Sequence, residues 1–123
     1  MQRDMVLIRS ILLRLAEHEH GFAGDVNLQF DGTSDEHVAF HIHLLGQAGL
    51  LKTQENTDLA DLSPSAIPLF ITWEGYEFLD AAADPSVWSK TLAQIGPAVK
   101  TVSFSVLKLV LEHYVKQQLG IPG

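Results

Sequence analysis

The stretch "FITWEGYEFLDAAADPSVWSK", residues 70–90, marks the change from a predicted strand to predicted helices. Its apolar start ends at Thr72, a residue type that caps helix N-termini by accepting a backbone hydrogen bond. Glu74 follows in the first turn, where a negative charge interacts favourably with the helix dipole. A glycine costs about 1 kcal/mol inside a helix. We therefore expect Gly75 to be there so that another backbone segment, or the ring of Trp73, can approach closely.

Two consecutive helices are predicted from this point. The first should place Tyr76, Phe78 and Leu79 in the core. Asp84 and Pro85 then have the pattern of an N-cap followed by a proline in the first helical position. The second helix ends at Gly96-Pro97, and its apolar stripe consists of Trp88, Leu92 and Ile95.

Two helices and a strand are predicted before this stretch. Asp4 is expected to cap a helix that reaches about Glu19, and Ser34 to cap a second helix over residues 34–48. Between them, "VNLQF" (residues 26–30) alternates apolar and polar residues, which predicts a half-buried strand. Gly49 is expected to adopt the left-handed conformation that ends many helices.

A β-hairpin should follow the second helix. "LLKTQ" and "LFIT" are its predicted strands, and the turn-rich "ENTDLADLSPSAIP" between them forms a broad acidic tip. We thus expect an α+β, mostly helical fold of the winged-helix type: helix, short strand, helix and hairpin wing. Residues 1–80 would form its core and residues 81–123 a C-terminal helical extension, all within one domain.

The chain resembles a domain-of-unknown-function family (DUF2513-like) of small bacterial and prophage winged-helix proteins. The resemblance covers nearly the full length and is carried by "MQRDMVLIRSILL", "FHIHLLGQAGLL", "ITWEGYEFLDAAADPSVWSK" and "LKLVLEHYVKQQLG". Its most specific part is the segment from Trp73 to Asp80. It implies the winged-helix fold, and it brings no activity or site residues with it.

Composition restricts the class of protein. The chain has 123 residues, the size of one domain, and it contains no cysteine, so thiolate metal sites, cysteine nucleophiles and disulfides are excluded. No apolar run approaches the roughly 20 residues that cross a bilayer, and the N-terminus lacks a secretory pattern. We expect a cytoplasmic protein without cofactors or membrane contact.

Enzymatic and metal sites are not indicated. No serine lies in a Gly-x-Ser-x-Gly motif, and no phosphate-binding loop is present. His37 and His41 have the i, i+4 spacing of zinc-binding helices, but a third ligand is missing, and a hydrogen bond from His41 to the backbone is the simpler interpretation. We predict neither an enzyme nor a metal site.

Charge argues against the DNA binding that a winged helix suggests. The net charge is −7, and residues 35–80 contain eight acidic residues and one lysine. Proteins that bind duplexes neutralise several phosphates with lysine or arginine. The outward face of the second helix has neither; it is expected to carry Glu36, Phe40, His43 and Gln47. Our first hypothesis is therefore a regulatory or protein-interaction module that uses this face, with Phe40 as its anchor.

The alternative is a DNA-binding transcription regulator of the bacterial or phage type. Its contacts would come from Arg3, Arg9 and Arg14, or from the lysines near the C-terminus.

The last predicted helix, residues 102–119, is apolar on nearly all sides. Such a helix must be covered all round, either as the central helix of the monomer or at a two-fold interface. We favour a homodimer through this helix, with one face packed inward. The candidate residues are Phe104, Leu107, Leu111 and Tyr114.

Overall fold

The first helix, α1 (Met5–Ala16), begins where the sequence predicts. In the computed structural model, which describes residues 1–122, the Asp4 carboxylate accepts hydrogen bonds from the backbone N–H groups of Val6 (2.9 Å) and Leu7 (3.2 Å). The helix ends three residues before the predicted Glu19, because the glycine-containing segment after it turns away. Its apolar stripe lies in the core.

Helix α2 (Asp35–Gln47) has the predicted caps at both ends. The Ser34 hydroxyl accepts a hydrogen bond from the backbone of His37 (3.1 Å). At the other end Gly49 has φ +77°, and Leu50 N–H donates to the carbonyl of Leu45 (3.0 Å). This is the hydrogen-bond pattern of a Schellman motif, and it directs the chain into the hairpin.

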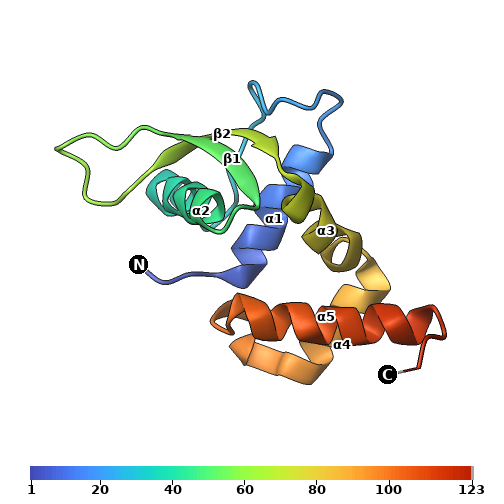
Figure 1. The fold of residues 1–123 in the computed structure, drawn as a ribbon. Coiled ribbons are helices and arrows are strands. Elements are labelled where there is room, and N and C mark those ends of the chain that lie inside the picture. Colours follow the sequence, from blue (N-terminus) through green and yellow to red (C-terminus); the bar gives the residue numbers. More distant parts are fainter. Residues whose placement is uncertain (123) are drawn as a thin grey trace.

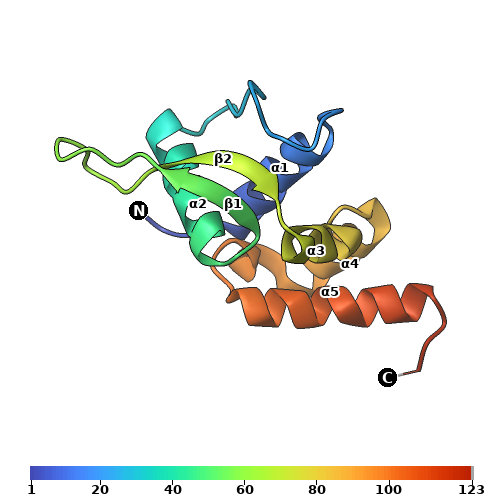
Figure 2. The same ribbon diagram turned by 45° about the horizontal axis from the view of Figure 1, so that its top comes forward.

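The hairpin consists of β1 (Leu51–Glu55) and β2 (Ala66–Ile71), which pair antiparallel with an irregularity between Lys52 and Thr53. The second strand begins earlier than predicted and includes Pro68. Figures 1 and 2 show the hairpin lying over α2, with its tip projecting beyond the rest of the molecule. The prediction of a hairpin with a long acidic tip is confirmed.

The strand predicted over residues 26–30 is wrong. Every second side chain, from Val26 to Phe30, is half-buried as the alternation indicates, but the segment has no ladder partner. The guanidinium of Arg14 donates to the carbonyl of Asn27 (2.8 Å) and contacts that of Gln29 (3.5 Å). Earlier in the same loop, Phe22 forms an isolated bridge with Phe70 of β2.

The junction between the hairpin and α3 (Trp73–Ala82) is built around Thr72 and Gly75. The Thr72 hydroxyl accepts a hydrogen bond from Gly75 N–H (3.1 Å) and donates to the Gly49 carbonyl (2.5 Å). A Cβ atom on Gly75 would lie 2.2 Å from the Leu50 carbonyl oxygen. Gly75 therefore allows α3 to pack against the end of α2, and the segment that approaches it is backbone rather than the ring of Trp73.

The remaining elements are α4 (Pro85–Ile95), the 3₁₀ turn η1 (Gly96–Lys100) and α5 (Phe104–Gln118). Asp84 caps α4 as predicted and also accepts a hydrogen bond from Gln118 at the end of α5 (3.1 Å). Helices α4 and α5 lie side by side below α1 and α3 (Figure 1).

One hydrophobic core includes residues from the five α-helices and the hairpin. Phe78 contacts Phe104 of α5, with the ring centroids 5.3 Å apart. Tyr76, predicted to be buried, is 47% exposed, since it faces away from this core. The largest fully buried apolar side chains are Met5, Ile11, Leu12, Leu45, Leu51, Leu107 and Leu111. The α+β, mostly helical fold class is confirmed.

Candidate interaction surfaces

Four residues were predicted to lie on the outward face of α2; two of them are exposed and two are half-buried. Glu36 and Gln47 are exposed, whereas Phe40 and His43 are half-buried. The ring of Phe40 lies 6.3 Å from that of His43, centroid to centroid, and packs edge-on against His41. Phe40 is therefore not the protruding anchor that the sequence suggested, but part of a shallow apolar surface.

A side-chain contact joins α2 to the hairpin. Nδ1 of His43 lies 2.8 and 2.9 Å from the two carboxylate oxygens of Glu55, the last residue of β1. A second contact lies further along the hairpin, where the Ser63 hydroxyl donates to Glu36 (3.0 Å). Exposed contacts of this kind each stabilise by about 1 kcal/mol or less. The first contact holds the end of β1 against the second half of α2, and the second holds the hairpin tip beside the start of α2.

The hairpin tip, residues 56–65, has a defined internal structure. Asp58 N–H donates to the Asp61 carboxylate (2.8 Å), and Asp61 N–H donates to the Asp58 carbonyl (3.0 Å). Thr57 and Ser65 hydrogen-bond each other across the base of the tip.

This structured tip presents two leucines to solvent. Leu59 and Leu62 are almost completely exposed and are flanked by Asp58 and Asp61. Scattered exposed leucines are common on protein surfaces. Here two of them lie on one projecting, hydrogen-bonded loop, and sequence reasoning missed them by counting only the acids of this loop. The signal was present as "DLADL" in a turn-rich segment.

Two of the three arginines proposed to contact DNA are used inside the fold. Arg9 donates to the Ala82 carbonyl (2.6 Å), and its guanidinium lies 4.5 Å from the ring centre of Trp88. Burial lowers the pKa of Arg9. Arg14 binds the loop after α1 through its hydrogen bond to Asn27. Only Arg3 of the three is exposed.

His41 is a buried structural residue. Its Nε2 accepts a hydrogen bond from Asp4 N–H (2.8 Å), and its Nδ1 lies 2.9 Å from the His37 carbonyl, to which it donates. These bonds use both ring nitrogens of the neutral imidazole. Burial lowers the pKa of His41, and its hydrogen bond to the His37 carbonyl offsets part of that effect. In residues 1–122 no group of three potential metal ligands comes together.

Helix α5 turns its predicted dimer residues toward its own chain. Leu107 and Leu111 are fully buried in the monomer, and Phe104 and Tyr114 are half-buried. A dimer contact through these two leucines would require the monomer to open, so they are not interface residues of the folded chain. The opposite side exposes Val106 and Leu109.

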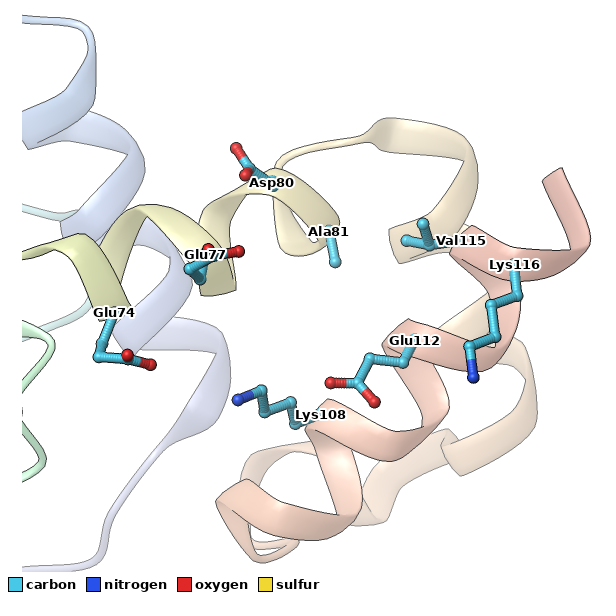
Figure 3. A pocket seen from close by; sticks show the side chains of 8 residues that line it. All are labelled: Glu74, Glu77, Asp80, Ala81, Lys108, Glu112, Val115 and Lys116. Atoms are coloured by element: carbon cyan, nitrogen blue, oxygen red, sulfur yellow. The ribbon is translucent and has the colours of Figure 1, made fainter. Parts of the chain in front are cut away.

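A groove of about 400 Å³ separates α3 from α5. Figure 3 shows acidic side chains of α3 on one side and alternating charges of α5 on the other. None of the ion pairs found in residues 1–122 crosses it. Its charged residues are Glu74, Glu77, Asp80, Lys108, Glu112 and Lys116.

The fold and surfaces define a small α+β protein with a helix-supported hairpin and an acidic exposed face. The model of a family described as "Hypothetical protein (DUF2513)" matches residues 2–102. An uncharacterized protein of Haemophilus influenzae is 31% identical over 120 residues, which cover 98% of this chain and 100% of that protein. The chain belongs to the DUF2513 family, as its sequence motifs suggest. No solved structure gives a significant match.

Among the residues that the structure describes, no helix combines the length and apolar character needed to span a bilayer.

Proposed function

We propose that this chain is a winged-helix protein-interaction module, regulatory rather than enzymatic, that functions as a homodimer. In this interpretation α2 corresponds to the recognition helix and the β1–β2 hairpin to the wing. The order of α1, α2, hairpin and α3 supports the assignment, as does the packing of the hairpin over α2. The strand that a winged helix usually has between its first helices is replaced here by the loop at residues 26–30.

The distribution of charge on α2 and the hairpin is the observation that carries this proposal. A winged helix that reads DNA places its recognition helix in the major groove. The corresponding surface of this chain has acidic side chains at the start of α2, at the end of β1 and at the hairpin tip. Helix α2 contains no lysine or arginine. The acidic residues of this surface are Asp35, Glu36, Glu55, Asp58 and Asp61.

The positive charges do not compensate for this acidity. Arg9 and Arg14 are engaged in the fold, which leaves Arg3 as the exposed arginine. On α2 and the hairpin the one lysine is Lys52, and the other lysines lie on α4, η1 and α5. A surface that contacts one or two phosphates gains little from counterion release. A protein partner with its own apolar and basic groups is better matched to this surface.

A salt titration of duplex binding tests the proposal. Fluorescence anisotropy with a labelled random duplex should show no saturable binding by the wild type at about 50 mM salt. A matched variant with Glu36→Lys and Asp58→Lys, two exposed positions, should gain salt-sensitive binding because charge is the limiting factor. Micromolar or tighter binding of the wild-type protein, with affinity falling steeply as salt rises, would instead establish the DNA-binding alternative.

A further inference from the structure

The hairpin tip presents two apolar side chains next to two carboxylates. Leu59 and Leu62 project from a loop whose backbone is held by five internal hydrogen bonds, so little conformational freedom remains to be lost on binding. Asp58 and Asp61 lie next to them. An anionic membrane or a nucleic acid would be repelled by these carboxylates, which leaves a protein surface as the match.

The same chain contains such a surface. Two adjoining depressions, of about 260 and 440 Å³, share Arg3 and Leu44 and lie between the N-terminal segment, α2 and the start of α5. We call them together the N-terminal hollow. Its lining is largely apolar and includes Met1, Phe40, Leu44, Leu50 and Phe104. A cavity of about 150 Å³ holds a benzene molecule, so the smaller depression has room for a leucine side chain.

Charge in the hollow is opposite to that of the tip. Arg3 is the one charged side chain among the described residues that line either depression. It is exposed and forms no ion pair within residues 1–122. An incoming acidic tip would place Asp58 or Asp61 near this guanidinium.

The positions of the two surfaces suit a reciprocal contact. In Figures 1 and 2 the hairpin tip and the N-terminus lie on the same side of the molecule. In a two-fold dimer each surface of one copy meets the other surface of its mate, so a tip and a hollow on one side can be exchanged between two copies.

We infer that the hairpin tip of one copy docks through Leu59 and Leu62 into the N-terminal hollow of a second copy, with Arg3 pairing with the tip carboxylates. This inference rests on the homodimer of the proposed function and assigns its interface. It moves the contact from α5, whose Leu107 and Leu111 are buried in the monomer, to the hairpin and the N-terminus.

Sedimentation velocity across about 1–100 μM tests the inference. The wild type should sediment at twice the 13.5 kDa chain mass. Leu62→Asp should raise the dimer dissociation constant by at least about a hundredfold, since a tenfold loss of affinity per leucine contact occurs at both copies of the interface. Leu62 is exposed in the monomer, so its substitution should leave the far-UV circular dichroism unchanged.

Three further single variants and one double variant identify the contact. Leu109→Asp introduces the same change on the exposed side of α5 and should leave the dimer intact. Arg3→Asp and Asp58→Arg should each weaken the dimer, and the two together should restore it at least in part.

A wild-type protein that stays at the monomer mass overturns both the docking and the dimer. A dimer that resists Leu62→Asp and is broken by Leu109→Asp overturns the docking and leaves a dimer through α5. Neither result concerns the exclusion of DNA, which the duplex titration measures separately.

Discussion

Substituting Gly75 by alanine tests the contact that joins the hairpin to α3. The added Cβ would lie 2.2 Å from the Leu50 carbonyl oxygen and 2.6 Å from Cγ2 of Ile71. Real Cβ contacts essentially never fall below 3.0 Å, so the two segments must separate by about 0.8 Å. The Leu50 carbonyl cannot move freely, because it accepts a hydrogen bond from Thr72 N–H (3.2 Å) while Leu50 N–H closes the end of α2.

The expected cost follows from these restraints. Overpacking in a well-packed region costs about 1–3 kcal/mol and sometimes more. Replacing glycine by alanine in a helix returns at most about 1 kcal/mol, and less in a first turn. We expect Gly75→Ala to lower the free energy of unfolding by about 2 kcal/mol, which corresponds to a fall in Tm of roughly 8 °C for a chain of this size.

Urea denaturation followed by tryptophan fluorescence and circular dichroism measures this effect. Trp88 is buried and Trp73 is 76% exposed, so the fluorescence change reports mainly on Trp88. Gly21→Ala is the matched control, because its Cβ would meet nothing within 4 Å; it should change stability by less than about 0.5 kcal/mol. If Gly75→Ala is as stable as this control, the close approach of Leu50 to α3 is wrong.

Two further predictions concern buried polar contacts. Burial lowers the pKa of His41 below its ordinary 6.5, so the unfolded chain binds a proton more readily than the folded chain does. The stabilisation by neutral His41 should be fully present above pH 6.5 and should be lost as the pH falls toward the folded-state pKa. In urea titrations His41→Leu should have a lower free energy of unfolding than wild type, and that free energy should depend less on pH between pH 5 and 7. An equally steep pH dependence would contradict the assigned role of His41. Arg9→Ala removes the hydrogen bond to Ala82 and the contact with Trp88, and it should lower the free energy of unfolding by about 1–3 kcal/mol. Arg9→Lys should not restore the lost stability. Lys90→Ala, at an exposed position of α4, is the control and should match wild type in thermal melts of the same set of variants.

Local signals explain why most helix boundaries could be predicted. An N-cap needs one side chain and the N–H group two or three residues later, so Asp4, Ser34, Thr72 and Asp84 were identifiable from sequence alone. The same holds for Gly49, whose left-handed conformation depends on its immediate neighbours. Each of these features is complete within about six residues.

The failed strand shows where local information ends. Alternation at residues 26–30 predicted correctly that every second side chain faces the protein. A strand also needs a partner to pair with its backbone groups, and the alternation says nothing about that partner. Here the side chain of Arg14, which is twelve residues or more away, binds the carbonyls instead.

The sequence also did not predict which apolar residues are exposed. Tyr76 is two residues from the buried Phe78 in sequence, yet it faces solvent. Leu107 and Leu111 face the core on a helix that is apolar nearly all round. Which side of such a helix turns inward depends on the packing of α4 and α3 against it. For this reason the sequence did not show that Leu107 and Leu111, two of the predicted dimer residues, are buried in the monomer.

The sequence also overstated the positive charge available to a ligand. Counted along the chain, Arg9 and Arg14 belong to an N-terminal basic group that could approach DNA. In the fold each guanidinium is held by a backbone carbonyl and lies over an aromatic ring, Trp88 for Arg9 and Phe30 for Arg14. Releasing either one to reach a phosphate would break contacts that support the core. The acidity of the α2 and hairpin surface is therefore opposed by less free positive charge than composition implies, which strengthens the case for a protein partner.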